Sequence, residues 1–143
     1  MLIDQISIFV ANQPGRLTEI TSVLAGAGID IRALSLADTT DFGILRLIVN
    51  NPAGAEEALK ARGLTVRKTK VIAAKLDDTP GALHSVLKIL TDREISVEYA
   101  YAFITPKNDD ACVILRVENN EAAIAALTEN GVRLLTAEQI YKI

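Results

Sequence analysis

The chain has 143 residues, half of them hydrophobic, and its 15 basic and 18 acidic side chains leave a formal net charge of −3. This length suits one ordinary domain or two small ones, and the slight acidic excess argues against nucleic-acid binding, which usually requires a basic face. The single cysteine, Cys112, excludes an internal disulfide and fits a reducing compartment. No apolar run approaches the roughly 20 residues of a membrane span, and the segment 1–11 lacks the cationic start of a signal peptide. We therefore expect a soluble, cytoplasmic protein that contacts neither membrane nor nucleic acid.

The hydrophobic pattern of the first 28 residues predicts a strand followed by a helix. Ile6, Ile8 and Val10 alternate with other residues, as in a half-buried strand. After Pro14 and Gly15 the apolar residues take helical spacing, and glycines near position 28 are typical of the end of such a helix.

Two strands, a helix and a final strand are predicted next. The runs 29–37 and 44–49 are rich in β-branched and other apolar residues, and turn-forming residues at 39–41 separate them. A second helix is expected to begin after Asn51 as its N-cap and to end at Gly63. A last strand near 64–67 completes the series.

The second half of the chain repeats this pattern. The segment Asn12-Gln13-Pro14-Gly15-Arg16-Leu17 returns as Asp78-Thr79-Pro80-Gly81-Ala82-Leu83, so that positions 12 and 78 are 66 residues apart. Further along, we align Gly43 with Cys112, a spacing of 69, and assign three extra residues to the polar stretch around 106–109. A helix is expected from about Asn120 to Gly131, and a capping-box pattern at 136–139 predicts a short last helix.

The order strand-helix-strand-strand-helix-strand, found twice, predicts an α+β fold. We expect two ferredoxin-like βαββαβ modules, at 1–69 and 70–143, each with a four-stranded antiparallel sheet and both helices on one face.

The Pro-Gly turn before the first helix of each half is the best candidate for chemistry because it occurs twice. The first N–H groups of a helix lack intrahelical partners and carry partial positive charge. Gly15 permits close approach to the backbone, so the amides of Gly15, Arg16 and Leu17 could hold a carboxylate. The helix dipole contributes only about 0.3–2 kcal/mol, far below the roughly 8 kcal/mol of micromolar binding. Other groups must therefore contribute, and an interpretation in which Pro-Gly merely begins the helix stays open.

This turn, read as N-x-P-G-x-L or D-x-P-G-x-L and followed by Gly-Ile-Asp-Ile at 28–31, resembles the ACT domain. Both halves fit, so nearly the whole chain resembles a tandem ACT protein. The resemblance implies regulatory modules that bind amino acids, often where two modules meet with their sheets side by side. In the first half it implies ligand-binding roles for Asn12, Gln13, Pro14, Gly15, Arg16, Leu17 and Asp30. In the second half it implies the same roles for Asp78, Thr79, Pro80, Gly81, Ala82, Leu83 and Ser96.

The two turns differ in the residue that opens them. Asn12 offers a donor and an acceptor and can serve either end of a zwitterion, whereas ionised Asp78 only accepts and repels a carboxylate. If the two halves of one chain pair, Asn12 faces Ser96 and Asp78 faces Asp30, which brings two anions together. If the first halves of two chains pair, Asn12 meets Asp30. The sequence leaves both pairings open; we favour the Asn12 turn and expect Asp78 to act mainly as a helix cap.

Other possible functional signals have plainer explanations. The glycines at 25–28 close a helix instead of opening one, unlike a dinucleotide fingerprint. His84 is the only histidine, so neither a metal site nor a nucleophile triad is expected through it. Cys112 is expected to be buried and inert. Tyr99, Tyr101 and Phe103 alternate along one strand and are expected to pack on one shared face, while the third strands lack the aromatics that RNA-binding domains use for stacking.

We therefore expect a non-catalytic regulatory or sensor protein that binds an amino-acid-like small molecule and acts as a homodimer. No nucleophile–base pair, metal cluster or phosphate-binding loop points to an enzyme, and no cofactor is expected. The alternative is a protein-interaction regulatory subunit of a metabolic enzyme with no ligand of its own.

Overall fold

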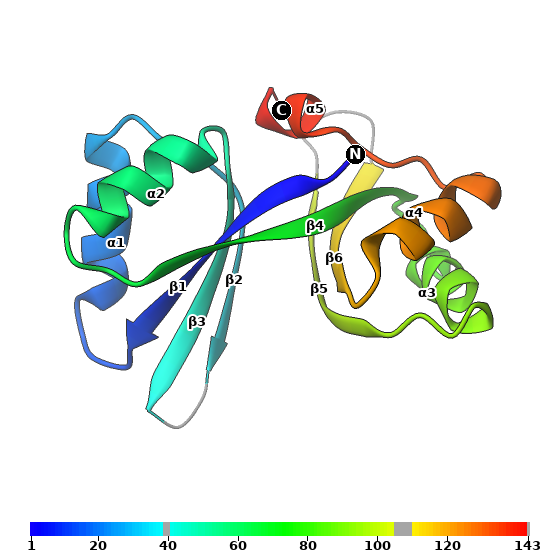
Figure 1. Cartoon of the computed structure of the whole chain (residues 1–143), viewed down its shortest axis with the longest axis horizontal. Helices are drawn as coiled ribbons and strands as arrows, with labels where there is room; N and C mark the ends of the chain where they lie inside the picture. The colour runs from blue at the N-terminus through cyan, green and yellow to red at the C-terminus, as the bar shows by residue number, and fades with distance from the viewer. Residues whose placement is uncertain (39–40, 105–109, 143) are drawn as a thin grey trace. The chain divides into compact units, whose positions relative to one another are not determined.

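The computed structural model describes residues 1–38, 41–104 and 110–142, and these contain six strands and five helices (Figure 1). The strands are β1 (Ile3–Ala11), β2 (Ile31–Asp38), β3 (Phe42–Val49), β4 (Val66–Asp77), β5 (Val97–Ile104) and β6 (Asp110–Val117). The helices are α1 (Arg16–Gly26), α2 (Pro52–Lys60), α3 (Ala82–Asp92), α4 (Asn120–Glu129) and α5 (Ala137–Tyr141). The expected turn residues 39–40 and the insertion at 106–109 lie outside the described residues. Within the described ranges, no helix is both long and apolar enough to span a membrane.

The fold is a mixed α+β arrangement whose hydrogen-bonded strands follow the order β2-β3-β1-β4-β6-β5. The two separate four-stranded sheets that we expected are not confirmed. The predicted strand near 64–67 and the first strand expected in the second half form a single strand of 12 residues, β4. Neither glycine nor proline interrupts the chain between them, so nothing in the local sequence ends the first strand before the second begins.

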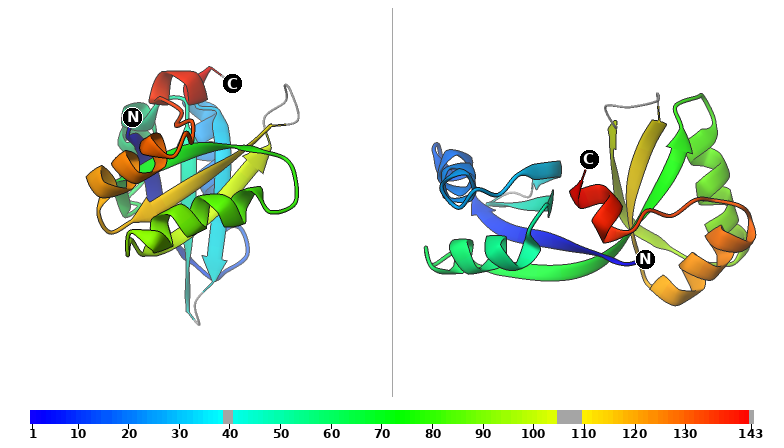
Figure 2. Two further views of the ribbon diagram at one scale, coloured as in Figure 1. Left: turned by 90° about the vertical axis from the view of Figure 1, so that its right-hand side faces the viewer. Right: turned by 90° about the horizontal axis from the view of Figure 1, so that it is seen from above.

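The chain divides into two compact units, one formed mainly by Asp4–Thr69 and the other by Met1–Ile3 with Lys70–Tyr141. In the first unit, α1 and α2 lie side by side and cover one face of the strands (Figure 1 and Figure 2). The core between helices and strands is built from aliphatic side chains, among them Ile6, Ile8, Leu45, Leu47, Ile20, Leu24 and Leu59.

The second unit repeats this packing with α3 and α4 against β4, β6 and β5. Its core is also aliphatic and contains Ile72, Val113, Leu115, Val86, Leu90 and Leu127. A short extended segment takes the place of a last strand, because Leu134 bridges Ala74 and the amide of Lys75 donates to the carbonyl of Arg133 at 2.8 Å.

The strand register corrects our alignment of the two halves. Val10 pairs with Gly43 in the first unit, and Leu76 pairs with Ala111 in the second. Positions 10 and 76 are 66 residues apart, and positions 43 and 111 are 68 apart. The aligned spacing of 69 was therefore wrong by one residue, and the second half carries two extra residues in this hairpin instead of three.

The same spacing of 68 holds for the helix caps. Asn51 caps α2 by accepting from the amide of Gly54 at 3.0 Å, and Asn119 caps α4 by accepting from the amide of Ala122 at 3.1 Å. This confirms Asn51 as the predicted N-cap. The predicted capping box is confirmed as well, since the Thr136 amide donates to Gln139 at 2.9 Å and the Gln139 amide donates to the Thr136 hydroxyl at 3.2 Å.

With the corrected spacing, Cys112 corresponds to Ile44. Its neighbour Val113 belongs to the core beneath the helices, so the alternation of a strand turns Cys112 to the opposite face. There Cys112 pairs with Phe103, and Tyr101 pairs with Ile114, which confirms that the alternating aromatic residues of β5 share one face. Cys112 is fully buried, as predicted, and burial raises its pKa from 9.0 to about 12.

Each Pro-Gly turn ends in a glycine that directly precedes its helix. Gly15 has φ +89° and Gly81 has φ +87°, in the left-handed region that favours glycine. Neither α1 nor α3 has a side-chain cap. The expected capping role of Asp78 is therefore wrong, because the glycine occupies the N-cap position of α3.

We expect Gly15→Ala to lower the free energy of unfolding by about 1 kcal/mol, because alanine is strained at positive φ. A Cβ at position 15 would meet no atom within 4 Å, so the cost is conformational and not steric. Gly26→Ala is the matched control: its Cβ also meets nothing within 4 Å, but it lies in the helix, where alanine gains about 0.5–1 kcal/mol. Urea unfolding of both variants measures the difference; equal stabilities would contradict the assigned turn geometry.

We expect the Cys112 thiol to resist alkylation in the folded chain. Its raised pKa lowers the thiolate fraction near pH 8 about a thousandfold, and the thiolate is the reactive form. Above roughly pH 9 the unfolded chain loses this proton while the folded chain keeps it, so the free energy of unfolding falls as pH rises, by up to about 1.4 kcal/mol per pH unit. Maleimide labelling followed by mass spectrometry, with the urea-unfolded chain as reference, tests this. Similar labelling rates in both states would refute it.

Candidate ligand-binding site

The turn between β1 and α1 is held by two backbone hydrogen bonds. The amide of Gln13 donates to the carbonyl of Ala11 at 2.8 Å, and the amide of Arg16 donates to the carbonyl of Gln13 at 3.4 Å. The second unit uses the same bonds: Thr79 donates to Asp77 at 2.9 Å, and Ala82 donates to Thr79 at 3.2 Å. The repeated sequence thus folds into a repeated turn.

Several amides at the start of α1 have no hydrogen-bond partner among the described residues. Among the described residues, none accepts a hydrogen bond from the amide of Gly15, Leu17 or Thr18. This set differs from the predicted one: the Arg16 amide is engaged within the turn, whereas the Thr18 amide is open. Together with the positive end of the helix dipole, these donors suit an anionic group such as a carboxylate.

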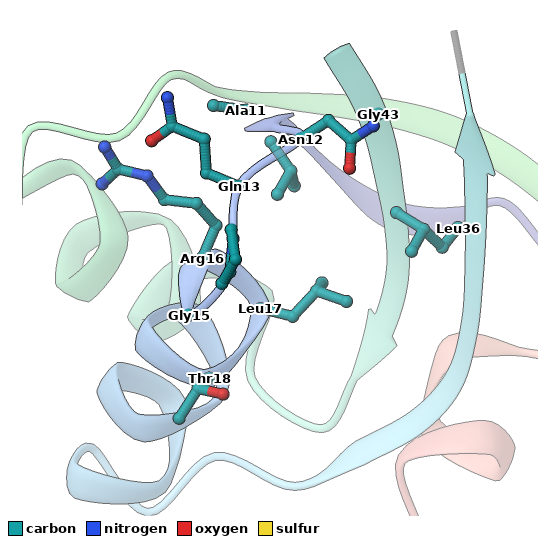
Figure 3. Close-up of a pocket in the computed structure, with 11 residues that line it drawn as sticks. Ala11, Asn12, Gln13, Gly15, Arg16, Leu17, Thr18, Leu36 and Gly43 are labelled. Atoms are coloured by element: carbon teal, nitrogen blue, oxygen red, sulfur yellow. The ribbon is translucent and has the colours of Figure 1, made fainter. Parts of the chain in front are cut away.

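A cavity of about 420 Å³ lies directly over this turn (Figure 3). All six predicted residues of the turn, 12 to 17, line it. Five further lining residues come from other positions: Val10 and Ala11 at the end of β1, Thr18 in α1, Leu36 in β2 and Gly43 in β3. This volume lies within the range of about 300–1,000 Å³ that is typical of small-molecule sites.

The sequence interpretation missed these five residues. The alternation in β2 places Leu36 on the helix-covered face, because Leu36 pairs with the core residue Leu45. Its closeness to the turn depends on the pairing of β1, β3 and β2, which joins positions 10, 43 and 38 across the sheet. A local sequence pattern alone does not show which residues pair across a sheet.

Polar and apolar groups occupy different parts of the cavity. The side chains of Leu17 and Leu36 point toward each other across it, whereas Gln13 and Arg16 extend away on the other side of the turn (Figure 3). The Arg16 guanidinium forms an ion pair with Glu19 at 3.2 Å. The Asn12 side chain lies over Gly43 at the rim (Figure 3). The cavity therefore combines open amides and one side-chain amide with an apolar wall.

Asp30 does not belong to this cavity. It precedes β2, whereas the Asn12 turn lies beside the other end of that strand, where Asp38 pairs with Gly43. The Asp30 carboxylate pairs with Arg32 at 2.6 Å, and its side chain remains 58% exposed. Within one unit the structure thus separates Asp30 from Asn12.

The second turn lines a wider and more polar cavity of about 790 Å³. Thr79, Pro80, Gly81 and Ala82 line it, whereas Asp78 and Leu83 are not among the described residues that do. The lining also includes charged and titratable side chains, namely Lys75, Asp77, His84, Asp110 and Arg133. Lys75 and Asp110 form an ion pair at 2.8 Å. Ser96 lines a different cavity with Arg93 and Glu94, so the structure does not bring it to the Asp78 turn.

Comparisons with known proteins identify the family. The family model described as an ACT domain pair matches residues 1–143. The crystal structure of protein BT0572 from Bacteroides thetaiotaomicron is 42% identical, has a TM-score of 0.94, and covers 100% of this chain and 98% of that chain.

The fold also occurs in the regulatory subunits of aspartate kinase. The ligand-free form from Thermus thermophilus is 19% identical with a TM-score of 0.65, covering 91% of this chain and 94% of that chain. The subunit from Thermus flavus is 17% identical with a TM-score of 0.59, covering 88% and 90%. No curated protein matches the chain in sequence. Because the family model extends over every residue, the resemblance inferred from the duplicated turn is confirmed, and the chain belongs to the family of ACT domain pairs.

Proposed function

We propose that the chain is a regulatory protein, without catalysis of its own, that binds a small amino acid or related zwitterion at the Asn12 turn. The observation that carries this proposal is the cavity over the turn, where open amides meet an apolar wall. Membership of the ACT family and the fold shared with regulatory subunits of aspartate kinase support it.

In this proposal the ligand carboxylate accepts hydrogen bonds from the amides of Gly15, Leu17 and Thr18. Each such bond contributes about 0.5–1.5 kcal/mol net, and bonds to a charged group contribute more. The Asn12 carboxamide oxygen accepts from the ligand ammonium group. The ligand side chain lies against Leu17 and Leu36. The sum of these modest contributions suits a sensor that binds and releases its ligand in the micromolar to millimolar range.

We assign the function to the Asn12 turn and not to the Asp78 turn. The second cavity is larger, its Lys75 is engaged by Asp110, and the carboxylates of Asp77 and Asp110 in its lining would repel a ligand carboxylate. A zwitterion therefore finds a poorer set of partners there.

We further propose that two chains assemble through β2. This strand ends the hydrogen-bonded order, so one of its edges has no neighbouring strand among the described residues, and Leu34 and Leu36 are 60% and 49% exposed beside it. Antiparallel pairing of β2 with β2 of a second copy would bring the start of one strand to the end of the other. The second copy's Asp30 would then approach the Asn12 turn and could receive the ligand ammonium group.

A panel of amino acids in a thermal-shift assay tests ligand binding. At a concentration of 100 times Kd a ligand adds about 2.7 kcal/mol, which corresponds to a rise in Tm of about 5–11 °C for a chain of this size. Asn12→Ala should reduce the shift at the same ligand concentration, because it removes the oxygen that accepts from the ligand ammonium group. Ser22→Ala truncates a polar side chain at an exposed position of α1 outside the cavity and should preserve the shift.

Two results would overturn the assignment. If no amino acid or related acid shifts Tm, the protein-interaction subunit of a metabolic enzyme becomes the better account. If Asn12→Ala and the parent chain respond alike, the ligand binds elsewhere, and Asp78→Ala then shows whether the second turn is used.

Light scattering coupled to size exclusion tests the assembly. We expect a dimer that the Leu34→Arg variant shifts toward monomer, because a buried unpaired cation at the β2 edge is costly. The control is Leu83→Arg, which places the same charge at a leucine of α3. This leucine is 44% exposed and lies far from β2 in the chain. A parent chain that stays monomeric with and without ligand would refute the β2 assembly.

A further inference from the structure

We infer that the Asn12 cavity selects amino acids with an uncharged aliphatic side chain, and that Leu36, seated against Gly43, is the residue that sets this specificity. The inference rests on the proposed function and names the ligand class for that site.

The wall of the cavity that lies away from the open amides is aliphatic. Leu17 from α1 and Leu36 from β2 face each other across it (Figure 3). Val10 also lines the cavity and is only 6% exposed. Leu17 and Leu36 remain 40% and 49% exposed. A ligand side chain placed between them would remove apolar surface from water on both sides.

A charged ligand side chain finds no partner at this wall. Arg16 is the one charged residue among the described residues that line the cavity. Its guanidinium pairs with Glu19 at 3.2 Å and extends away from Leu17 and Leu36 (Figure 3). An aspartate or lysine ligand would therefore lose hydration of its side chain without a compensating contact.

Gly43 determines where Leu36 lies. A Cβ built on Gly43 would be 3.2 Å from Cδ1 of Leu36 and 3.3 Å from the carbonyl oxygen of Ala37, both tighter than ordinary contact. The methyl group of Leu36 thus occupies space that any other residue at position 43 would fill. Glycine here lets the leucine lie back against β3 and keeps the cavity open.

The second unit carries the opposite combination. The strand pairing makes Ala102 the counterpart of Leu36 and Ala111 the counterpart of Gly43. Ala102 thus has a small side chain where Leu36 has a large one, and Ala111 has a Cβ where Gly43 has none. The second cavity has charged residues in its lining and neither of these alanines. The aliphatic wall is thus a property of the first unit, and one chain should bind one such ligand.

Isothermal titration of the full chain with a homologous series tests the inference. The ligands are alanine, 2-aminobutyrate, norvaline and leucine, with aspartate and lysine as charged members. We expect Kd to fall about fourfold for each methylene group that becomes buried, at a stoichiometry of one per chain. Aspartate and lysine should bind more weakly than alanine.

Leu36→Ala should flatten this series: alanine should bind within about twofold of the parent, while leucine loses about tenfold, since the lost contact is purely apolar. Gly43→Ala should push Leu36 into the cavity and weaken leucine more than alanine. Leu34→Ala is the matched control, because Leu34 lies two residues away on the same strand and face but outside the cavity. Leu34→Ala can change the Kd of every ligand by a similar factor through its effect on assembly. The dependence of Kd on the length of the ligand's aliphatic side chain should nevertheless persist.

The outcomes separate the two proposals. If no ligand of the series binds, the proposed function itself fails. If the amino acids bind but the length of the aliphatic chain has no effect, if charged side chains bind best, or if Leu36→Ala preserves the full dependence, the site stands and the inferred specificity is refuted.

Discussion

The backbone at the start of α1 is the constraint on which the site depends. Pro14 and Gly15 bring the chain from strand to helix within a few residues, and the left-handed glycine occupies the N-cap position where a capping side chain would ordinarily lie. With no such cap, the amides of Leu17 and Thr18 remain open toward the cavity. A small acid bound there would replace the cap, so that ligand binding and completion of the helix start become one event.

The Pro-Gly turn occurs in both units, but the two units do not form the same site. Both turns have nearly the same φ at the glycine and the same pattern of backbone hydrogen bonds. What differs is what the neighbouring strands present: Leu36 and Gly43 in one unit, Lys75 and Asp110 beside the other turn. The turn supplies a general affinity for anions, and the strand residues decide which molecule can use it. Two copies of one backbone can in this way acquire different ligands, or one copy can lose its ligand while it keeps the fold.

The features that could be predicted from the sequence are those encoded within a few neighbouring residues. The Asn51 cap, the capping box at Thr136 and the helices all follow from local patterns, and the structure confirms them. Register is different, because it depends on residues far apart in the chain. Aligning Gly43 with Cys112 was one residue off, and a single residue moves a side chain to the other face of a strand. For the same reason, the alternation of residues in β2 indicates which face of the sheet Leu36 lies on, but it does not show that Leu36 lies beside the turn.

Leu36 also connects the ligand site to the proposed assembly, since it lies both in the cavity and on the strand with the open edge. A ligand that orders this side chain changes the surface that a second β2 would meet. If the ligand binds the paired state more tightly than the single chain, thermodynamic reciprocity requires pairing to raise ligand affinity by the same factor. A second copy's Asp30 on the ligand ammonium group would supply such a difference between states. The ligand then needs no long path through the molecule to regulate assembly, because its own side chain and the assembly surface share one leucine.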